Sequence, residues 1–326
     1  MKKGNFWREL SAPLFVQAPM EDVTDTVCRQ MIARCGRPDV FFTEFTNVDG
    51  MFSEGKEIVT QRLKFTEIER PLVAQVWGAN PDNFYKAAQY IKELGFDGID
   101  INMGCPQKDV IKKGLCAALM NNRNLATDII EAVKDGAGGL PVSVKTRIGM
   151  NTIITEDWLG FLLEHNLDAL IIHGRTVKEM SQVPAHWDEI AKAVSLRARS
   201  KKDTVLIGNG DVKSREDGLE KIAASGIDGV MIGRGILENP WVFNTDEKYK
   251  NPENVSSNER LATYAKHVRL HQETWGSTKH FDRLKKYMKM YIRDFPGSSE
   301  IRAKVAETRN AEELVLVLDK DEREDD

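Results

Sequence analysis

Eight short apolar runs, each followed by a longer amphipathic stretch, constrain the fold of this 326-residue chain more than any other feature. Several runs are continuous and rich in β-branched residues, which is typical of strands buried on both faces. Eight strand–helix repeats favour a closed (β/α)₈ barrel, which needs about 250 residues. The runs lie at residues 14–18, 40–45, 72–77, 98–102, 142–146, 169–173, 204–208 and 229–232.

The pattern changes after the eighth run. Residues 244–258 are polar and turn-rich, which indicates a linker, and helical periodicity follows. The sequence therefore predicts an α/β fold, a (β/α)₈ TIM barrel followed by a small C-terminal all-helical domain. The expected boundaries are 1–245 for the catalytic barrel, 259–318 for the helical domain and 319–326 for a disordered acidic tail. An open doubly wound sheet is the alternative, but no GxGxxG follows the first run.

Composition narrows the class of protein. A hydrophobic content of 41% supports a large core, and the net charge of −4 gives no overall attraction to nucleic acid or membrane. Four cysteines without a CxxC pair suggest no zinc ribbon and fit a reducing cytoplasm. No run approaches the roughly 20 apolar residues that span a bilayer, and the N-terminus does not resemble a signal peptide. We expect a cytoplasmic protein without membrane contact or bound metal.

Charge is distributed unevenly along the chain. Residues 251–310 contain 12 Lys or Arg and 7 Asp or Glu, so the helical part is mildly basic. Such a surface suits contact with a polyanion, but it is equally an ordinary solvated helix face, and charge alone leaves both readings open.

Glycine-containing triplets follow the seventh and eighth runs, where barrels often bind phosphate. Asn209, Gly210 and Asp211 follow the seventh, and Gly233 and Arg234 follow the eighth. Glycines let backbone N–H groups approach phosphate oxygens, and an arginine adds a charged donor. The alternative is a pair of tight turns that simply require glycine.

Three further polar side chains end other runs. Lys145 leaves a buried strand, where an unpaired ammonium is costly, so it can face the N1–C2=O edge of an anionic reduced flavin. His173 can donate to a phosphate, although a core histidine is the alternative. Gln75 can hydrogen-bond a ring system through its amide, or it can be a polar residue of the barrel.

Cys105 lies between Gly104 and Pro106 at the end of the fourth run. Cysteines often act as small buried hydrophobes, but this one stands in a rigid turn at the catalytic end of the barrel. With an ordinary thiol pKa of about 8.5 it is mostly protonated at neutral pH and can donate a proton. Cys28, Cys35 and Cys116 are interpreted as core residues, and Cys116→Ala is expected to leave activity nearly intact.

These motifs together resemble the tRNA-dihydrouridine synthases, from about residue 13 to 243 and more loosely beyond. The matching segments, in chain order, are PMEDVTD (19–25), NMGCP (102–106), GLCAALM (114–120), VKTRIG (144–149), HGRT (173–176), GNGDV (208–212) and GRGILENPW (233–241). The combination is specific, although each segment alone is weak. The resemblance implies an FMN-binding barrel and a helical domain that helps grip tRNA.

The resemblance also implies roles for individual residues. The residues expected to line a tightly bound FMN are Pro19, Met20, Glu21, Gln75, Lys145, His173, Asn209, Gly210, Asp211, Gly233 and Arg234. Cys105 would be the catalytic proton donor, and Asn102 and Arg147 would face the flipped uracil. In the helical part, Lys285, Lys286 and Lys289 are expected to contact tRNA, because with Arg293 they share one face of a helix.

Two departures from the family pattern stand out. Cys116 replaces a residue that is usually small. After HGRT, Ser181, Val183 and His186 stand where a Tyr, a Gly and an Asp are usual. The Tyr is thought to help hold the base, so these changes bear on substrate placement rather than on FMN chemistry.

The implied reaction is that of an oxidoreductase acting on the CH–CH group of uracil in tRNA. It comprises reduction of FMN by NADPH, hydride transfer to C6 of an everted uridine, and protonation of C5 by Cys105. We expect a monomer. Three alternatives stay open: an FMN barrel acting on a free pyrimidine, a flavin-free barrel that binds a sugar phosphate, and a tRNA-binding or folding module without catalysis.

Overall fold

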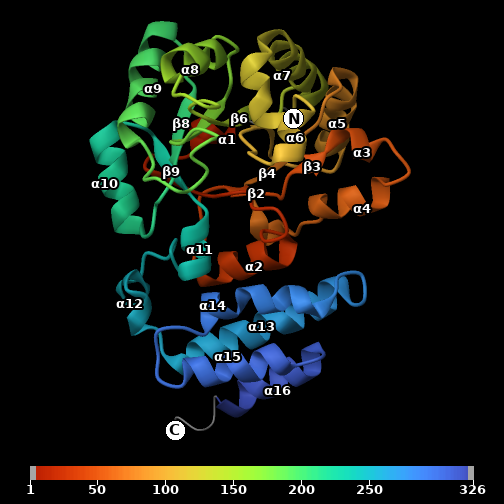
Figure 1. Cartoon of the computed structure of the whole chain (residues 1–326), viewed down its shortest axis with the longest axis vertical. Coiled ribbons are helices and arrows are strands. Elements are labelled where there is room, and N and C mark those ends of the chain that lie inside the picture. Colours follow the sequence, from red (N-terminus) through yellow and green to blue (C-terminus); the bar gives the residue numbers. More distant parts are fainter. Residues whose placement is uncertain (1–4, 322–326) are drawn as a thin grey trace. The chain divides into compact units, whose positions relative to one another are not determined.

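A parallel sheet that curves into a barrel is the core of the larger compact unit of the chain (Figure 1). The computed structural model of the chain describes residues 5–321. The strand order is β1-β9-β8-β7-β6-β5-β4-β2, and a bridge between Val16 and Val40 joins the two ends. The predicted (β/α)₈ barrel is therefore confirmed. The strands are β1 Leu14–Gln17, β2 Phe41–Phe42, β3 Thr46–Asn47, β4 Leu72–Trp77, β5 Gly98–Met103, β6 Val142–Arg147, β7 Ala169–His173, β8 Val205–Asn209 and β9 Gly229–Ile232.

The second run was expected to form one strand over residues 40–45, and this was wrong in detail. It forms two short strands, β2 and β3, which both pair with β4. Between them the Thr43 hydroxyl accepts the Gln75 backbone N–H at 3.1 Å. A side-chain oxygen thus replaces a backbone carbonyl as the acceptor for this N–H group of β4. The backbone pairing resumes at Thr46 and Val76.

Helices surround the sheet and follow local capping signals. Asn80 accepts the Asp82 N–H at 2.9 Å and Pro81 opens α5, as the sequence predicts. In the first unit the helices are α1 Phe6–Glu9, α3 Val48–Met51, α4 Lys56–Thr60, α5 Pro81–Glu93, α6 Lys108–Lys112, α7 Arg123–Ala137, α8 Thr155–Leu163, α9 Trp187–Ser200 and most of α10 Arg215–Ser225, with 3₁₀ helices η1 Gln61–Leu63, η2 Glu67–Glu69 and η3 Cys116–Asn121.

The barrel interior is apolar at one end and polar at the other. Trp7 of α1 is buried in one cluster with Leu14, Val16, Ile171 and Ile207. Further along the strands, buried polar side chains replace these apolar ones, beginning with Gln75 and Asp100. Active sites of such barrels lie at the carboxyl ends of the strands, so this polar end is where a site is expected.

The chain divides into two compact units. The first comprises residues 1–26, 38–212 and 216–233, and the second 27–37, 213–215 and 234–326. The predicted domain boundaries at 245, 259 and 318 stay predictions. Elements of the second unit are α2 Thr26–Cys35 (from residue 27), α11 Arg234–Glu238, α12 Glu247–Lys250, η4 Pro252–Asn254, α13 Ser257–Trp275, η5 Phe281–Tyr287, α14 Met288–Tyr291, α15 Ser298–Glu307 and α16 Ala311–Asp321.

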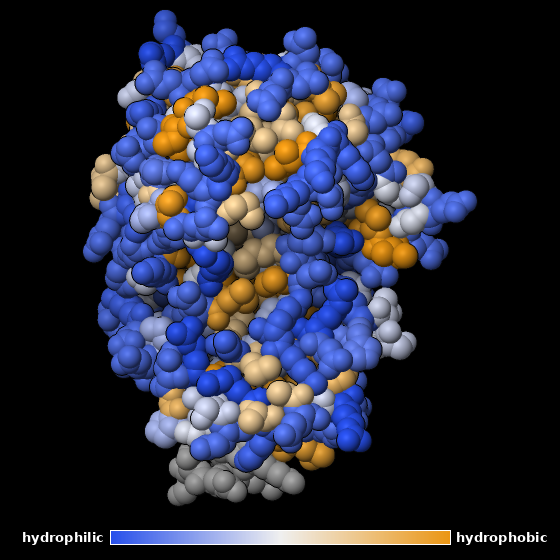
Figure 2. Space-filling view, viewed as in Figure 1, coloured by the Kyte–Doolittle hydropathy of each residue, from blue (hydrophilic) through white to orange (hydrophobic). Residues whose placement is uncertain are grey.

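The second unit is helical in its C-terminal part, where α13 packs against α16. Cys28 and Cys35 of α2 are buried, as expected. Residues 319–321, the start of the predicted acidic tail, belong to α16, and residues 322–326 lie outside the described residues. No helix between residues 5 and 321 is long and apolar enough to cross a membrane. In Figure 2 most residues on the visible face are hydrophilic, with hydrophobic ones in patches between them.

Candidate active site

A layer of buried polar side chains crosses β4, β5 and β6. Gln75, Asp100 and Ser143 are in register on these strands. The Ser143 hydroxyl donates to one Asp100 oxygen at 2.6 Å and the Gln75 amide donates to the other at 2.7 Å. Burial, only partly offset by these two donors, raises the pKa of Asp100 to about 7. Gln75 therefore has partners within the protein, and its predicted bond to FMN stays a prediction.

Asn102 connects this layer to the turn that carries Cys105. Its Nδ2 donates to Gln75 Oε1 at 2.9 Å. Its Oδ1 accepts the backbone N–H groups of Gly104 at 3.0 Å and Cys105 at 2.9 Å. The side chain that was expected to face uracil thus shapes the turn that carries Cys105. A sequence motif could not show this contact, since it depends on the side-chain rotamer.

Cys105 is nearly buried, with 9% exposure, and packs against Val110, Leu115 and Cys116. The Cys116 thiol and the Gln107 backbone N–H donate hydrogen bonds to its sulfur, and Arg147 adds positive charge. The Cys116 hydrogen bond is the largest influence, and together these groups lower the pKa of Cys105 to about 7 in spite of burial. The expectation of an ordinary thiol was therefore wrong, because distant residues supply donors that stabilise the thiolate.

Lys145, at the polar end of β6, has few partners. Its Nζ donates to Asn209 Oδ1 at 3.1 Å, and Asn209 Nδ2 donates to the Met231 carbonyl at 2.8 Å. Among residues 5–321 it makes no other hydrogen bond and no ion pair. Burial and then the Arg147 charge lower the pKa of Lys145 to about 8. An ammonium in this setting fits an anionic ligand group, which would supply the missing counter-charge.

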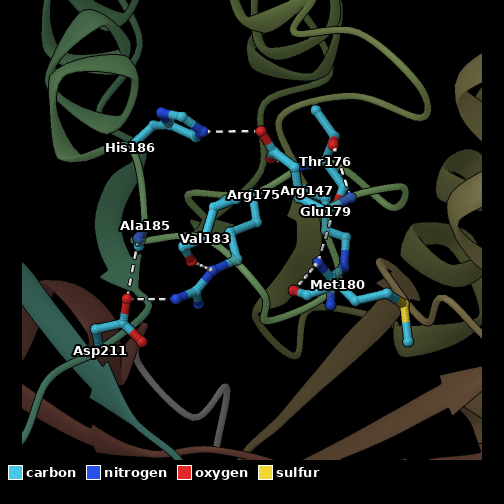
Figure 3. A network of polar contacts seen from close by, with 9 residues as sticks. All are labelled: Arg147, Arg175, Thr176, Glu179, Met180, Val183, Ala185, His186 and Asp211. Carbon is cyan, nitrogen blue, oxygen red and sulfur yellow. Dashed lines mark hydrogen bonds and ion pairs between the residues drawn. The ribbon is translucent and has the colours of Figure 1, made fainter.

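Arg147 holds two loops together, and Figure 3 shows its contacts with the loop after β7. Its Nε donates to the Gly104 carbonyl at 2.9 Å, next to Cys105. Its Nη1 donates to the carbonyls of Thr176 at 3.0 Å and Met180 at 3.2 Å in the loop after β7. Burial and the charge of Arg175 lower the pKa of Arg147 to about 10. The Nη2 group makes no hydrogen bond with the described residues, and the predicted contact of Arg147 with uracil stays a prediction.

Two polar contacts hold the loop between β7 and α9, and both are drawn in Figure 3. Arg175 pairs with Asp211, and its Nη1 lies 3.2 Å from His173 Nε2. His186 Nε2 lies 2.9 Å from Glu179 Oε1. Two of the residues that depart from the family pattern, Val183 and His186, are part of this arrangement.

Each of the three departing positions has a definite place. Val183 offers its carbonyl to Arg175 Nε at 2.7 Å. His186 pairs with Glu179, whose other oxygen accepts the Thr176 N–H at 2.7 Å. Ser181 is exposed. The loop is thus ordered by its own polar contacts, and the sequence offered no signal for the Glu179–His186 pair.

The two glycine triplets differ. Gly210 has φ of 130°, and a Cβ there would lie 2.6 Å from Ala185 Cβ, so the turn itself requires glycine. Asp211 accepts the Ala185 N–H at 2.9 Å as well as pairing with Arg175. At Gly233 a Cβ would meet nothing closer than 3.5 Å. Arg234 is the first residue of α11 in the second unit. The predicted phosphate contacts of these loops stay predictions.

The segment after β1 contains Pro19, Met20 and Glu21. The Met20 N–H donates to the Thr24 hydroxyl at 2.9 Å. Glu21 Oε1 accepts Arg62 Nε at 2.8 Å, a partner 41 residues away that sequence reasoning missed. Carboxylate oxygens of Glu21, Asp22 and Glu44 lie within 4.8 Å of one another, but Arg62 already supplies positive charge there. The FMN contacts and the absence of metal remain expectations.

Lys285, Lys286 and Lys289 do not lie on one continuous helix, so the prediction that they share one helix face was wrong, while their contact with tRNA stays a prediction. The segment that carries these lysines is a 3₁₀ helix in η5 and an α-helix in the short α14. Within η5 the Leu284 carbonyl accepts a hydrogen bond from the Tyr264 hydroxyl at 2.8 Å. Lys285 donates to the carbonyls of Ala306 at 3.1 Å and Thr308 at 2.7 Å, near the end of α15. Lys286 and Lys289 are exposed.

Lys289 and Arg293 nevertheless remain together. They line one open pocket of the second unit, of about 680 Å³, and the other lining residues are Asp294, Phe295, Pro296, Ser298 and Arg302. Three cationic side chains and one aromatic ring in one depression suit phosphate and base contacts, although Arg293 is paired with Asp294.

A parallel barrel with a cysteine, a lysine and an arginine at the carboxyl ends of its strands has the arrangement of a (β/α)₈-barrel enzyme. The family model described as "Dihydrouridine synthase (Dus)" matches residues 16–324. The chain belongs to the dihydrouridine synthase family, a family of oxidoreductases.

Similar proteins cover nearly the whole chain. "Probable tRNA-dihydrouridine synthase 2" of Bacillus subtilis (strain 168) is 45% identical over 322 residues, 98% of this chain and 97% of the relative. "Probable tRNA-dihydrouridine synthase" of Staphylococcus aureus (strain COL) is 43% identical over 327 residues, 99% and 98% of the two chains. The similarity therefore includes both units.

Solved structures agree on the barrel fold alone. Morphinone reductase in complex with tetrahydroNAD has a TM-score of 0.50 at 14% identity, covering 74% of this chain and 89% of that one. Histamine dehydrogenase from Rhizobium sp. 4-9 has a TM-score of 0.55 at 13% identity, covering 78% and 48%.

Proposed function

We propose that this protein is a tRNA-dihydrouridine synthase that reduces the C5–C6 double bond of a uridine in tRNA. The names of relatives at 43–45% identity support this substrate. The observation that carries the chemistry is the position of Cys105 at the polar end of the barrel, with Lys145 and Arg147 facing it. A thiol there can donate a proton, and the neighbouring cationic groups suit an anionic cofactor.

The described residues fit FMN. Among the described residues Lys145 has no carboxylate ion-pair partner, and the space beside Gly233 is bounded by Ala18 and Met20 at 3.5 and 3.8 Å from where a Cβ would lie. Lys145 would hold the N1–C2=O edge, and the loops after β8 and β9 would hold the phosphate. FMN, when bound and reduced by NADPH, supplies the hydride that reaches C6 of the uracil.

The protein's own residues would complete the reduction. Cys105 donates a proton to C5, where negative charge develops as C6 gains hydride. The free Nη2 group of Arg147 donates to a uracil carbonyl, and the second N–H of Asn102 Nδ2 is placed to do the same. A uridine stacked in folded RNA cannot reach this depth, so the base must be everted into the barrel.

The protein as purified is expected to carry non-covalent FMN and to form dihydrouridine in unmodified tRNA with NADPH. Acid release and chromatography identify the flavin, and mass spectrometry of digested tRNA detects dihydrouridine. A parallel reaction with free uridine distinguishes the enzyme from one that acts on a free pyrimidine. Recovery of FAD or no flavin, or reduction of free uridine at the same efficiency as tRNA, would count against the proposal.

We also propose that Lys286 and Lys289 contact the tRNA backbone. The double variant Lys286→Glu/Lys289→Glu should raise the KM for tRNA about tenfold or more at low salt. It should also lower the salt dependence of binding, because a protein with fewer phosphate contacts displaces fewer counterions when it binds. FMN content and NADPH oxidation should not change. Filter binding at several salt concentrations measures the effect.

The choice of lysines follows from the structure. Lys285 is left intact because its ammonium holds two backbone carbonyls, so its loss would disturb folding as well as binding. Lys201→Glu/Lys202→Glu is the matched control, since these residues lead into the opposite, amino-terminal end of β8. Equal tRNA affinity of both double variants would show that Lys286 and Lys289 form only a solvated surface.

A further inference from the structure

A second thiol, that of Cys116, packs in the same buried cluster as Cys105 and is a hydrogen-bond partner of its sulfur. Cys116, the first residue of η3, is 2% exposed and belongs to the same cluster as Cys105, Val110 and Leu115. Phe45 and Trp77 pack against this cluster from outside. The other members are apolar, so the two sulfurs are the polar side-chain groups of the cluster and each is the natural partner of the other.

The backbone at Cys116 adopts a conformation that costs energy for this residue type. Its φ is 52°, in the left-handed region that favours glycine. The preceding turn closes with the Leu115 N–H donating to the Val110 carbonyl at 3.2 Å. η3 then packs against β5 and α6, the elements before and after Cys105, so the strained residue lies in one cluster with the sulfur that the proposed reaction uses.

The direction of the hydrogen bond follows from the charges around the pair. Arg147 and Lys145 at the end of β6 place positive charge near Cys105, the Gln107 N–H donates to it, and Glu21 after β1 opposes them. Cys116 is more deeply buried, and its contact with Cys105 and its burial raise its pKa well above the ordinary value. Cys116 therefore keeps its proton and acts as donor, while Cys105 is the acceptor.

We propose that Cys116 is a positioning residue whose S–H donates to the Cys105 sulfur and thereby sets the balance between the thiol and the thiolate of Cys105. The relevance of this balance to catalysis rests on the proposed function, in which Cys105 is the proton donor. Cys116 transfers no proton itself, and no bond between the two sulfurs is formed or broken.

The test compares Cys116→Ala with Cys116→Ser in the full-length protein under reducing conditions. Alanine removes the donor, while serine keeps an O–H in the same place. The rate of Cys105 alkylation by iodoacetamide is followed against pH by mass spectrometry of its peptide, because only the thiolate reacts. In the wild type the midpoint is expected near the Cys105 pKa of about 7.

Cys116→Ala should raise this midpoint by about one pH unit or more, which slows alkylation at pH 7 by roughly fivefold. Cys116→Ser should restore most of the wild-type profile. Val110→Ala is the matched control, because it also removes side-chain volume from the cluster but leaves the donor. Cys116→Gly is a second variant without the donor, and its backbone suits the left-handed conformation.

A second readout concerns the reaction. If Cys105 must be protonated, the rate of tRNA reduction by Cys116→Ala relative to wild type should rise about fivefold between pH 6 and pH 8, since the variant keeps its thiol to higher pH. At pH 6 the wild type and Cys116→Ala should differ little in rate. The expectation from the sequence that Cys116→Ala keeps nearly intact activity should therefore hold at low pH only.

An unchanged alkylation midpoint in both Cys116→Ala and Cys116→Gly would overturn the inference, as would an equal shift in Val110→Ala. A shifted alkylation midpoint, with a ratio of tRNA reduction rates that does not change with pH, would support the contact between the two thiols. It would count against Cys105 as the proton donor. Failure of the inference and failure of the proposed mechanism are thus distinguishable.

Discussion

Cys105→Ala is expected to lower the rate of uracil reduction on tRNA by roughly 10²–10⁴, the usual contribution of a positioned general acid. FMN content and NADPH oxidation should survive, because the thiol is needed only after hydride has left the cofactor. The turn should keep its shape, since Asn102 binds the backbone N–H groups of Gly104 and Cys105 rather than the thiol. Single-turnover assays with pre-reduced enzyme measure the second half-reaction alone.

Cys28→Ala is the control for this experiment, because it also removes one buried thiol but lies in α2. It should retain activity within about a factor of two or three. The residual reaction of Cys105→Ala should also lose the decline with rising pH that deprotonation of Cys105, with its pKa of about 7, imposes on the wild type. Near-normal reduction by Cys105→Ala would mean that another group supplies the proton.

The sequence predicted the barrel because each strand is specified locally by its own apolar run. Residues such as Asn102, Lys145 and Asn209 end different strands, and parallel strands bring their carboxyl ends together, so their proximity was also predictable. The split of the second strand was not, because it depends on the Thr43 hydroxyl meeting the backbone of β4.

Contacts between loops could not be predicted from the sequence either, because they also depend on segments that meet only in the folded structure. Arg147 is recognisable as a functional arginine, but its bonds to Gly104, Thr176 and Met180 depend on two loops folding toward each other. Cys116 likewise appears as one more core cysteine until the turn before η3 places it against Cys105. Such tertiary contacts alter the acidity of Cys105, which residue identity alone does not reveal.

The second large effect is expected at Lys145. Lys145→Met should weaken FMN binding by roughly 10–100-fold, the value of a charge-assisted hydrogen bond in a partly buried site. Methionine keeps most of the side-chain volume, so the barrel should stay folded. Fluorescence titration of the FMN-free protein measures the dissociation constant, and Lys201→Met, at the end of α9, serves as the control lysine removal.

The pH dependence of FMN binding provides the sharper test. Without a ligand, burial lowers the pKa of Lys145 to about 8, so above this pH the side chain is mostly neutral. An anionic group beside Nζ favours the ammonium, which means that FMN binding above pH 8 must be accompanied by uptake of a proton. FMN affinity of the wild type should therefore fall as pH rises beyond 8, by up to tenfold per unit.

Neighbouring groups do not account for such a slope. Asp100 and Cys105 have pKa values of about 7 and Arg147 of about 10, so between pH 8 and 9 Lys145 is the neighbour whose charge changes most. Lys145→Met should have weaker but nearly pH-independent affinity in this window, because methionine cannot take up the proton. If the variant and the wild type showed the same slope, Lys145 would not face the anionic part of FMN, and its ammonium would serve only to hold Asn209.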